Sequence, residues 1–156
     1  MALNAATTPL VITLTQGGAD AFVQGSVLTG LSGRQAYNVR AIFIEFTATN
    51  LQAMAQDCDI SVAITRRSKT AMPTLADTDV LYKQTLSGAF TTSGLAVIKG
   101  VDVYEPDGEL PIVEETIYAQ LDSTTLGTNT AIVRLEVEID TMSDIDRLNL
   151  ITRSLS

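Results

Sequence analysis

The side chains that most often carry out enzymatic chemistry are scarce in this sequence. It has no histidine, which excludes Ser-His-Asp and Cys-His arrangements and imidazole-bound zinc. Its single cysteine, Cys58, alternates with Ile60, Val62 and Ile64, a pattern that favours a small buried hydrophobe over a nucleophile. Carboxylates for a glycosidase-type pair are plentiful, but the chain has no Trp and only 5% aromatic residues to line a sugar-binding cleft. We therefore predict no enzymatic activity, no catalytic residues and no cofactor.

Three acidic clusters contain the oxygen ligands that calcium accepts. They are Asp57 with Asp59, Asp77 with Asp79, and the segment 105–109. None has the spacing of the twelve-residue EF-hand loop, and Asp is common in turns because it bonds to nearby backbone. We interpret all three as turns and predict no metal site.

Charge is distributed unevenly along the chain. The net charge is −8, and residues 100–146 hold twelve acidic groups and one basic group. Such a chain is not expected to bind nucleic acid through its overall field. The only basic cluster, TRRSKT, contains Arg66, Arg67 and Lys69. It is either a solvated strand end or one half of an electrostatic contact with the acidic region of another copy.

The stretch NTAIVRLEVEID, residues 129–140, alternates apolar and charged side chains. Ala131, Val133, Leu135, Val137 and Ile139 fall on one side, and Arg134, Glu136, Glu138 and Asp140 fall on the other. This predicts a strand with one dry and one charged face. The charged face is either solvated or turned to a partner. Together with the basic cluster, it supplies the predicted inter-subunit contacts: Arg66, Arg67, Lys69, Glu136, Glu138 and Asp140.

The elements that must position these residues are short strands separated by Gly-, Pro- and Asp-rich turns. Thr, a residue typical of strands, occurs 21 times among the 156 residues. Strand patterns occur at 9–16, 21–30, 37–50, 58–67, 94–105, 115–123 and 129–140, with bulges expected at Gly25 and Gly100. The last two strands are expected to form a hairpin. The strand at 37–50 is expected to be central, with Val39 on the same face as Ala41 and Phe43. The segment ADTDVLYKQTL is expected to be a short helix.

Seven or eight strands without a βαβ rhythm predict an all-β fold, an antiparallel β-sandwich. The eight-stranded jelly roll is favoured, with an immunoglobulin-like sandwich as the alternative. We expect an N-terminal arm at 1–8, the sandwich at 9–142, and a short helix or tail at 143–156 that starts with a capping pair, Ser143 and Asp146. No apolar run is long enough for a membrane span, and the N-terminus does not have the pattern of a secretory signal.

Two functions remain once catalysis is set aside. A structural subunit would cover its apolar surface with copies of itself, as the low charged fraction of 18% suggests. A glycan- or protein-recognition module would instead expose aromatic residues on its loops, for which Tyr37, Tyr82, Phe90 and Tyr104 are the candidates. The self-assembling subunit is the favoured prediction.

The Thr-rich strands, the opening PLVITLT, the pair ETIYAQLDS and NTAIVRLEVEID, and the missing catalytic residues resemble small jelly-roll coat or cement proteins of bacterial or archaeal viruses. The resemblance extends from about Pro9 to Asp140. It implies a viral capsid subunit that contacts copies of itself and other virion proteins, assembled in the host cytoplasm and located in the virion. The arm at 1–8 has no basic residue, so nucleic-acid binding through it is not expected.

Overall fold

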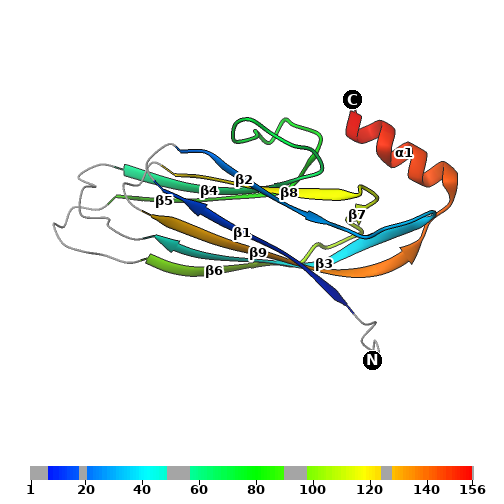
Figure 1. Ribbon diagram of the computed structural model, residues 1–156, viewed down its shortest axis with the longest axis horizontal. Coiled ribbons are helices and arrows are strands. Elements are labelled where there is room, and N and C mark those ends of the chain that lie inside the picture. Colours follow the sequence, from blue (N-terminus) through cyan, green and yellow to red (C-terminus); the bar gives the residue numbers. More distant parts are fainter. Residues whose placement is uncertain (1–6, 18–20, 49–56, 90–97, 124–127, 156) are drawn as a thin grey trace.

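The computed structural model describes residues 7–17, 21–48, 57–89, 98–123 and 128–155 (Figure 1). These residues form two stacked antiparallel sheets followed by one helix. The elements are β1 (Thr8–Gln16), β2 (Val23–Leu28), β3 (Gln35–Ala48), β4 (Asp57–Thr65), β5 (Val80–Ala89), β6 (Ile98–Tyr104), β7 (Pro111–Ile112), β8 (Thr116–Ser123), β9 (Asn129–Thr141) and α1 (Asp144–Leu155).

The strands pair in a nested order that identifies the fold. β1 pairs with β9, β2 with β8, β3 with β6, and β4 with β5, as in one long hairpin bent back on itself. Rolling this hairpin adds the pairs β3–β9 and β4–β8. The result is sheet A, in the order β1-β9-β3-β6 with β7 beside β3, and sheet B, in the order β2-β8-β4-β5. This is a jelly roll, as predicted.

The immunoglobulin-like alternative is wrong. In that fold the first two strands are neighbours in one sheet, whereas β1 and β2 lie in different sheets here. The predicted hairpin of the last two strands is wrong for a similar reason, because β8 lies in sheet B and β9 in sheet A. Alternation of apolar residues defines which side of a strand is buried but not which strand it pairs with.

The core lies between the sheets and follows the period-two pattern of the strands. Leu10, Ile12 and Leu14 of β1 are buried, and alternate apolar residues of β9 from Ala131 to Val137 face the same layer. The two predicted faces of β9 are therefore present. Ile139, predicted on the dry face, is 54% exposed near the C-terminal end of the strand.

A bulge in β3 changes which residues share a face. The register with β9 shifts between Val39 and Ala41, so that Arg40 is the extra residue. Val39 is consequently buried together with Ile42 and Ile44. The predicted grouping of Val39 with Ala41 and Phe43 is wrong, because strict alternation holds only along an unbroken ladder.

Two other local predictions are also wrong. The segment that resembled a capped helix is β5, whose residues 80–89 pair with β4. The pairing of β2 with β8 and of β3 with β6 is regular through Gly25 and Gly100, so neither glycine is a bulge. In the turn before β3, Gly33 has a left-handed backbone conformation with φ 59°, which glycine adopts without steric cost.

Part of the outer face of sheet B is covered by its own chain. The connection 66–79 lies over it, as the green loop above this sheet in Figure 1. Gln24 of β2 accepts a hydrogen bond from the Lys69 amide at 2.7 Å and donates one to Ser68 at 2.9 Å. Lys83 of β5 donates to the Pro73 carbonyl at 2.9 Å, and Pro73 is buried. These bonds hold the connection against the sheet.

Helix α1 begins with the predicted capping pair. The Ser143 hydroxyl accepts a hydrogen bond from the Asp146 amide at 3.2 Å and donates to the Asp146 carboxylate at 2.5 Å. This satisfies one of the amides that a helix start leaves unpaired. Figure 1 shows α1 at the end of the sandwich, turned towards the side of sheet B.

Candidate subunit-contact surfaces

The outer face of sheet A carries apolar side chains that its own chain leaves exposed. Register places Val11, Arg134, Phe43 and Val103 in one row across β1, β9, β3 and β6. Val11 is 47% and Val103 50% exposed, and Ile132, one row along β9, is 37% exposed. We call Val11, Phe43, Val103 and Ile132 the apolar patch.

Charges within and around the patch are mostly paired. The Arg134 guanidinium lies 4.5 Å from the centre of the Phe43 ring and 3.1 Å from the Glu136 carboxylate. Glu45 is exposed opposite Ile132 in the row. Within the described residues the Glu45 carboxylate has no polar partner. The patch is thus an apolar surface with one unpaired acid.

Helix α1 turns its apolar side away from the body of the protein. Residues 145, 148 and 151 fall on one side of a helix with 3.6 residues per turn. Ile145 is 73% and Leu148 is 63% exposed, and Ile151 lies at the edge of the same side. We call these three residues the apolar stripe. In a free monomer this side would be expected to face the core.

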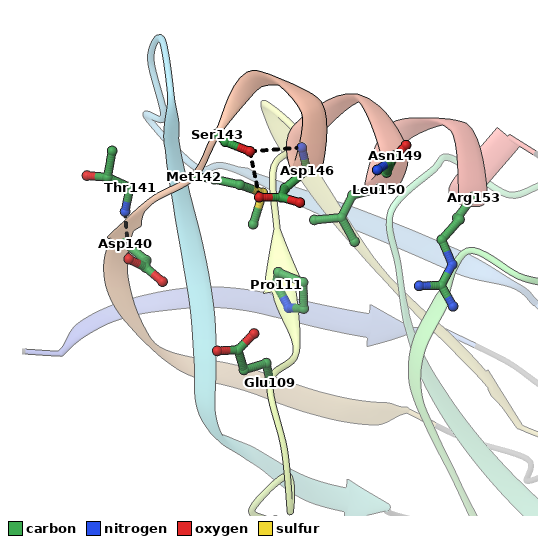
Figure 2. Close-up of a pocket in the computed structure, with 10 residues that line it drawn as sticks. All are labelled: Glu109, Pro111, Asp140, Thr141, Met142, Ser143, Asp146, Asn149, Leu150 and Arg153. Carbon is green, nitrogen blue, oxygen red and sulfur yellow. Dashed lines mark hydrogen bonds between the residues drawn. The ribbon is translucent and has the colours of Figure 1, made fainter.

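The opposite side of α1 borders a groove along its own sandwich. Figure 2 shows this groove, with Leu150 and Arg153 directed into it from α1. The groove has a volume of about 660 Å³ and is lined by Glu109, Pro111, Asp140, Thr141, Met142, Ser143, Asp146, Asn149, Leu150 and Arg153. Most of these side chains are polar and none is aromatic. The helix therefore presents a mostly polar side to this groove, and Ile145 and Leu148 of the apolar stripe to the surroundings.

The structure places the predicted basic cluster against acidic residues of the same chain. Arg66 forms a 3.0 Å ion pair with Glu114, and both side chains are largely buried. Lys69 lies 2.8 Å from the buried carboxylate of Asp79. The Arg67 guanidinium contains a buried nitrogen, Nη2, without a hydrogen-bond partner among the described residues. Two of the three cations thus fasten the connection 66–79.

The predicted acidic contacts also have partners within the chain. Glu136 pairs with Arg134 at 3.1 Å, and Glu138 pairs with Arg40 at 2.6 Å. Asp140 accepts a hydrogen bond from the Thr141 amide at 2.7 Å. Within one chain, none of these contacts joins a residue of the predicted basic cluster to one of the predicted acidic contacts. Their predicted role between subunits stays a prediction.

A second cleft, of about 470 Å³, lies between α1 and sheet B. Arg67, Glu115 and Tyr118 line it, together with Arg147 and Ile151 from the helix. Within the described chain, the Arg147 guanidinium has no acidic partner. Arg147 is thus an unpaired cation beside the apolar stripe.

Three of the four aromatic residues proposed for a recognition platform make contacts within the fold, and one of these three, Tyr104, is 39% exposed. Tyr37 is buried, and the rings of Tyr82 and Tyr104 stack at 4.7 Å between β5 and β6. The Tyr82 hydroxyl donates a 2.5 Å hydrogen bond to Asp102. Burial, reinforced by the Asp102 carboxylate, raises the pKa of Tyr82 well above its ordinary value. Phe90 lies outside the described residues.

Among the residues described, no three His, Cys, Asp or Glu side chains gather closely enough to hold a metal ion. Asp77 accepts a hydrogen bond from the Thr74 amide at 2.8 Å, as expected of a turn aspartate. Cys58 lies in β4, but its side chain is outside the described part of the structure. The helix found in the described chain is too short and too polar to span a membrane.

Two surface features were missed by sequence reasoning. Ile132 interrupts the charged face of β9, and its place beside Val11 and Phe43 depends on register across sheet A. The spacing of Ile145, Leu148 and Ile151 was visible, but a periodic pattern does not tell whether the apolar side faces inward or outward.

Comparison with protein-family models and with curated protein sequences gives no match. Among solved structures, the chain is similar to dimeric latent PorU from Porphyromonas gingivalis, with 6% identity and a TM-score of 0.49 over 86% of this chain. It spans 13% of that PorU chain. It is also similar to Desmodium yellow mottle tymovirus, with 7% identity and a TM-score of 0.30 over 91% of this chain and 94% of that one. For the empty head of Turnip yellow mosaic virus the identity is 10% and the TM-score 0.27, over 87% of this chain and 84% of that one.

At such low identities and TM-scores the likeness does not bear on function, and the jelly-roll assignment rests on the strand order.

Proposed function

We propose that this chain is a non-catalytic structural subunit that assembles with copies of itself, as a capsid protein of a virion. The observation that carries the proposal is the apolar surface that the chain leaves uncovered on both sheet A and α1. The connection 66–79 covers part of sheet B, whereas the apolar patch, and Ile145 and Leu148 of the apolar stripe, have no such cover from the described chain. Exposed apolar surface of this kind marks a contact site.

A closed shell requires each subunit to meet its neighbours through more than one surface. The apolar patch and the apolar stripe lie on different parts of the sandwich and can engage different neighbours. Arg66, Arg67, Lys69, Glu136, Glu138 and Asp140 are proposed as charged rim contacts. Most of them already have partners within the chain, so they act between subunits through long-range electrostatic attraction. Added salt weakens this attraction.

The bacterial or archaeal origin of such a virus is part of this proposal and rests on the sequence resemblance alone. The same holds for contacts with other virion proteins and for assembly in the host cytoplasm. The groove beside α1 does not favour a glycan-recognition module, because it has no aromatic lining residue.

Light scattering of the purified full chain, over a range of protein and salt concentrations, tests the proposal. We expect large assemblies of uniform mass, visible as closed particles by negative-stain electron microscopy, and weaker association when salt screens the rim contacts. A Leu75→Glu variant is the control, because Leu75 is 82% exposed but lies in the connection 66–79, outside both surfaces. A wild-type chain that stays monomeric at all concentrations would contradict the proposal.

A further inference from the structure

We infer that α1 of one copy packs on the outer face of sheet A of a neighbouring copy, with the apolar stripe on the apolar patch and Arg147 beside Glu45. This inference rests on the proposed self-assembly and names the two surfaces that carry it. The occupant of the patch is thus a second copy of this chain.

The two surfaces match in size and character. The stripe from Ile145 to Ile151 spans seven residues, and the six steps between its ends measure roughly 9 Å at 1.5 Å per residue. The row from Val11 to Val103 crosses four strands, or roughly 14 Å at about 4.8 Å per strand. Laid along this row, the apolar stripe therefore covers the greater part of it.

The unpaired charges of the two surfaces are opposite. Arg147 flanks the apolar stripe and Glu45 lies next to Ile132, and neither side chain has a partner among the residues described. Docking of the stripe on the patch brings a lone cation to a lone acid, which fixes the direction of the helix.

The helix does not reach the patch of its own chain. Nine residues of β9 separate Ile132 from Met142, and the ten steps between them span roughly 33 Å. Helix α1 then lies towards sheet B, where Arg147 and Ile151 border the second cleft. The contact therefore joins two different surfaces of two copies. Such a heterologous contact builds closed rings or shells, or open filaments where the rotation does not close.

Two substitutions block the two surfaces separately. Leu148→Glu places a charge in the stripe, and Ile132→Glu places one in the patch, both at exposed positions that the fold tolerates. We expect each variant to remain folded by circular dichroism. Each should need a protein concentration roughly tenfold or more above that of the wild type to associate. The reason is that the combined free-energy cost of losing one apolar contact and desolvating a charge exceeds about 1.4 kcal/mol. Leu75→Glu should assemble like the wild type.

Mixing the two variants distinguishes a helix-to-patch contact from any other. An equimolar mixture retains one intact stripe and one intact patch, so sedimentation velocity should show 1:1 heterodimers and nothing larger. If both variants assemble as the wild type does, the inference is wrong while self-assembly stands. If the mixture stays monomeric, the helix contacts some other surface and the inference is also wrong. A wild-type chain that never associates would overturn the proposed function itself.

A charge exchange tests the direction of the helix. Arg147→Glu and Glu45→Arg should each weaken the association of the copies several-fold. The chain that carries both substitutions should associate like the wild type, because each contact then has the acid on the helix and the cation on the sheet. Failure of the double variant to recover would contradict the placement of Arg147 beside Glu45. Wild-type monomers that instead bind phosphatidylcholine–phosphatidylglycerol vesicles, and lose that binding in Leu148→Glu, would overturn the inference.

Discussion

Gly25 occupies the place where β2 comes closest to β1 of the other sheet. A Cβ atom at this position would lie 2.8 Å from Ile12 Cγ2 and 3.0 Å from Leu14 Cδ2. Any side chain must therefore displace two buried core residues, and β2 has glycine here for lack of space, not because of a bulge.

We predict that Gly25→Ala lowers the free energy of unfolding by about 1–3 kcal/mol, the usual cost of overpacking a core. Urea unfolding followed by circular dichroism measures it. Gly17→Ala is the matched control, because a Cβ at Gly17 meets no atom within 4 Å. Equal stability of the Gly25→Ala and Gly17→Ala variants would show that β1 and β2 are not so close.

Tyr82 and Asp102 join the edges of the two sheets. Because burial and the Asp102 carboxylate raise the pKa of Tyr82, the native state keeps its proton at a pH where the unfolded chain, with a Tyr pKa of about 10, loses it. The stabilisation from this hydroxyl is therefore complete below about pH 10 and lost as pH rises above that value.

We predict that Tyr82→Phe costs about 1 kcal/mol of stability at pH 7, the net value of one hydrogen bond. The gap between wild type and variant should narrow above about pH 10. Urea midpoints at pH 7 and pH 11 measure both effects, with Tyr104→Phe as a control that keeps the ring stack. An equal gap at both pH values would contradict the assigned linkage.

At the scale of elements, alternation predicted most strands but not their partners. The burial pattern of β9 was readable because apolar and charged residues alternate without a break from Val133 to Glu138. The bulge at Arg40 could not be read from the sequence, because no residue type there marks it. The strand at 80–89 could not be read either, because VLYKQTL suits a helix or a strand equally. The start of α1 was predicted from Ser143 and Asp146, whose bond is local.

Helix α1 is the element that contributes least to its own domain. It makes no extensive contact with any strand, and its apolar stripe is exposed. We predict that a chain lacking residues 144–156 unfolds with a free energy within about 1 kcal/mol of the full chain, as for other surface changes, yet does not assemble. Calorimetry and sedimentation velocity on both chains test this. A large loss of stability would mean that the stripe is buried against the chain's own sandwich.

At the scale of the whole molecule, composition and strand number predicted the β-sandwich, but only the pairing order distinguishes the jelly roll from its alternatives. That order depends on contacts between distant segments, such as Leu10 with Leu135, which no local pattern contains. Whether a face is covered is equally non-local. The connection 66–79 carries the basic cluster over sheet B, so residues that looked like a partner surface form ion pairs within the chain.

The apolar patch and the apolar stripe remain exposed in this arrangement, and we propose that copies of the chain cover each other's exposed apolar residues there. Hydroxyl-radical footprinting with mass spectrometry, on dilute and on assembled protein, tests it most directly. We predict that Leu148, Ile145, Val11 and Val103 are labelled in the dilute protein and protected in the assembly, whereas Leu75 is labelled in both. Equal labelling of the first four residues in the two samples, or a chain that yields no assembly to label, would contradict the account.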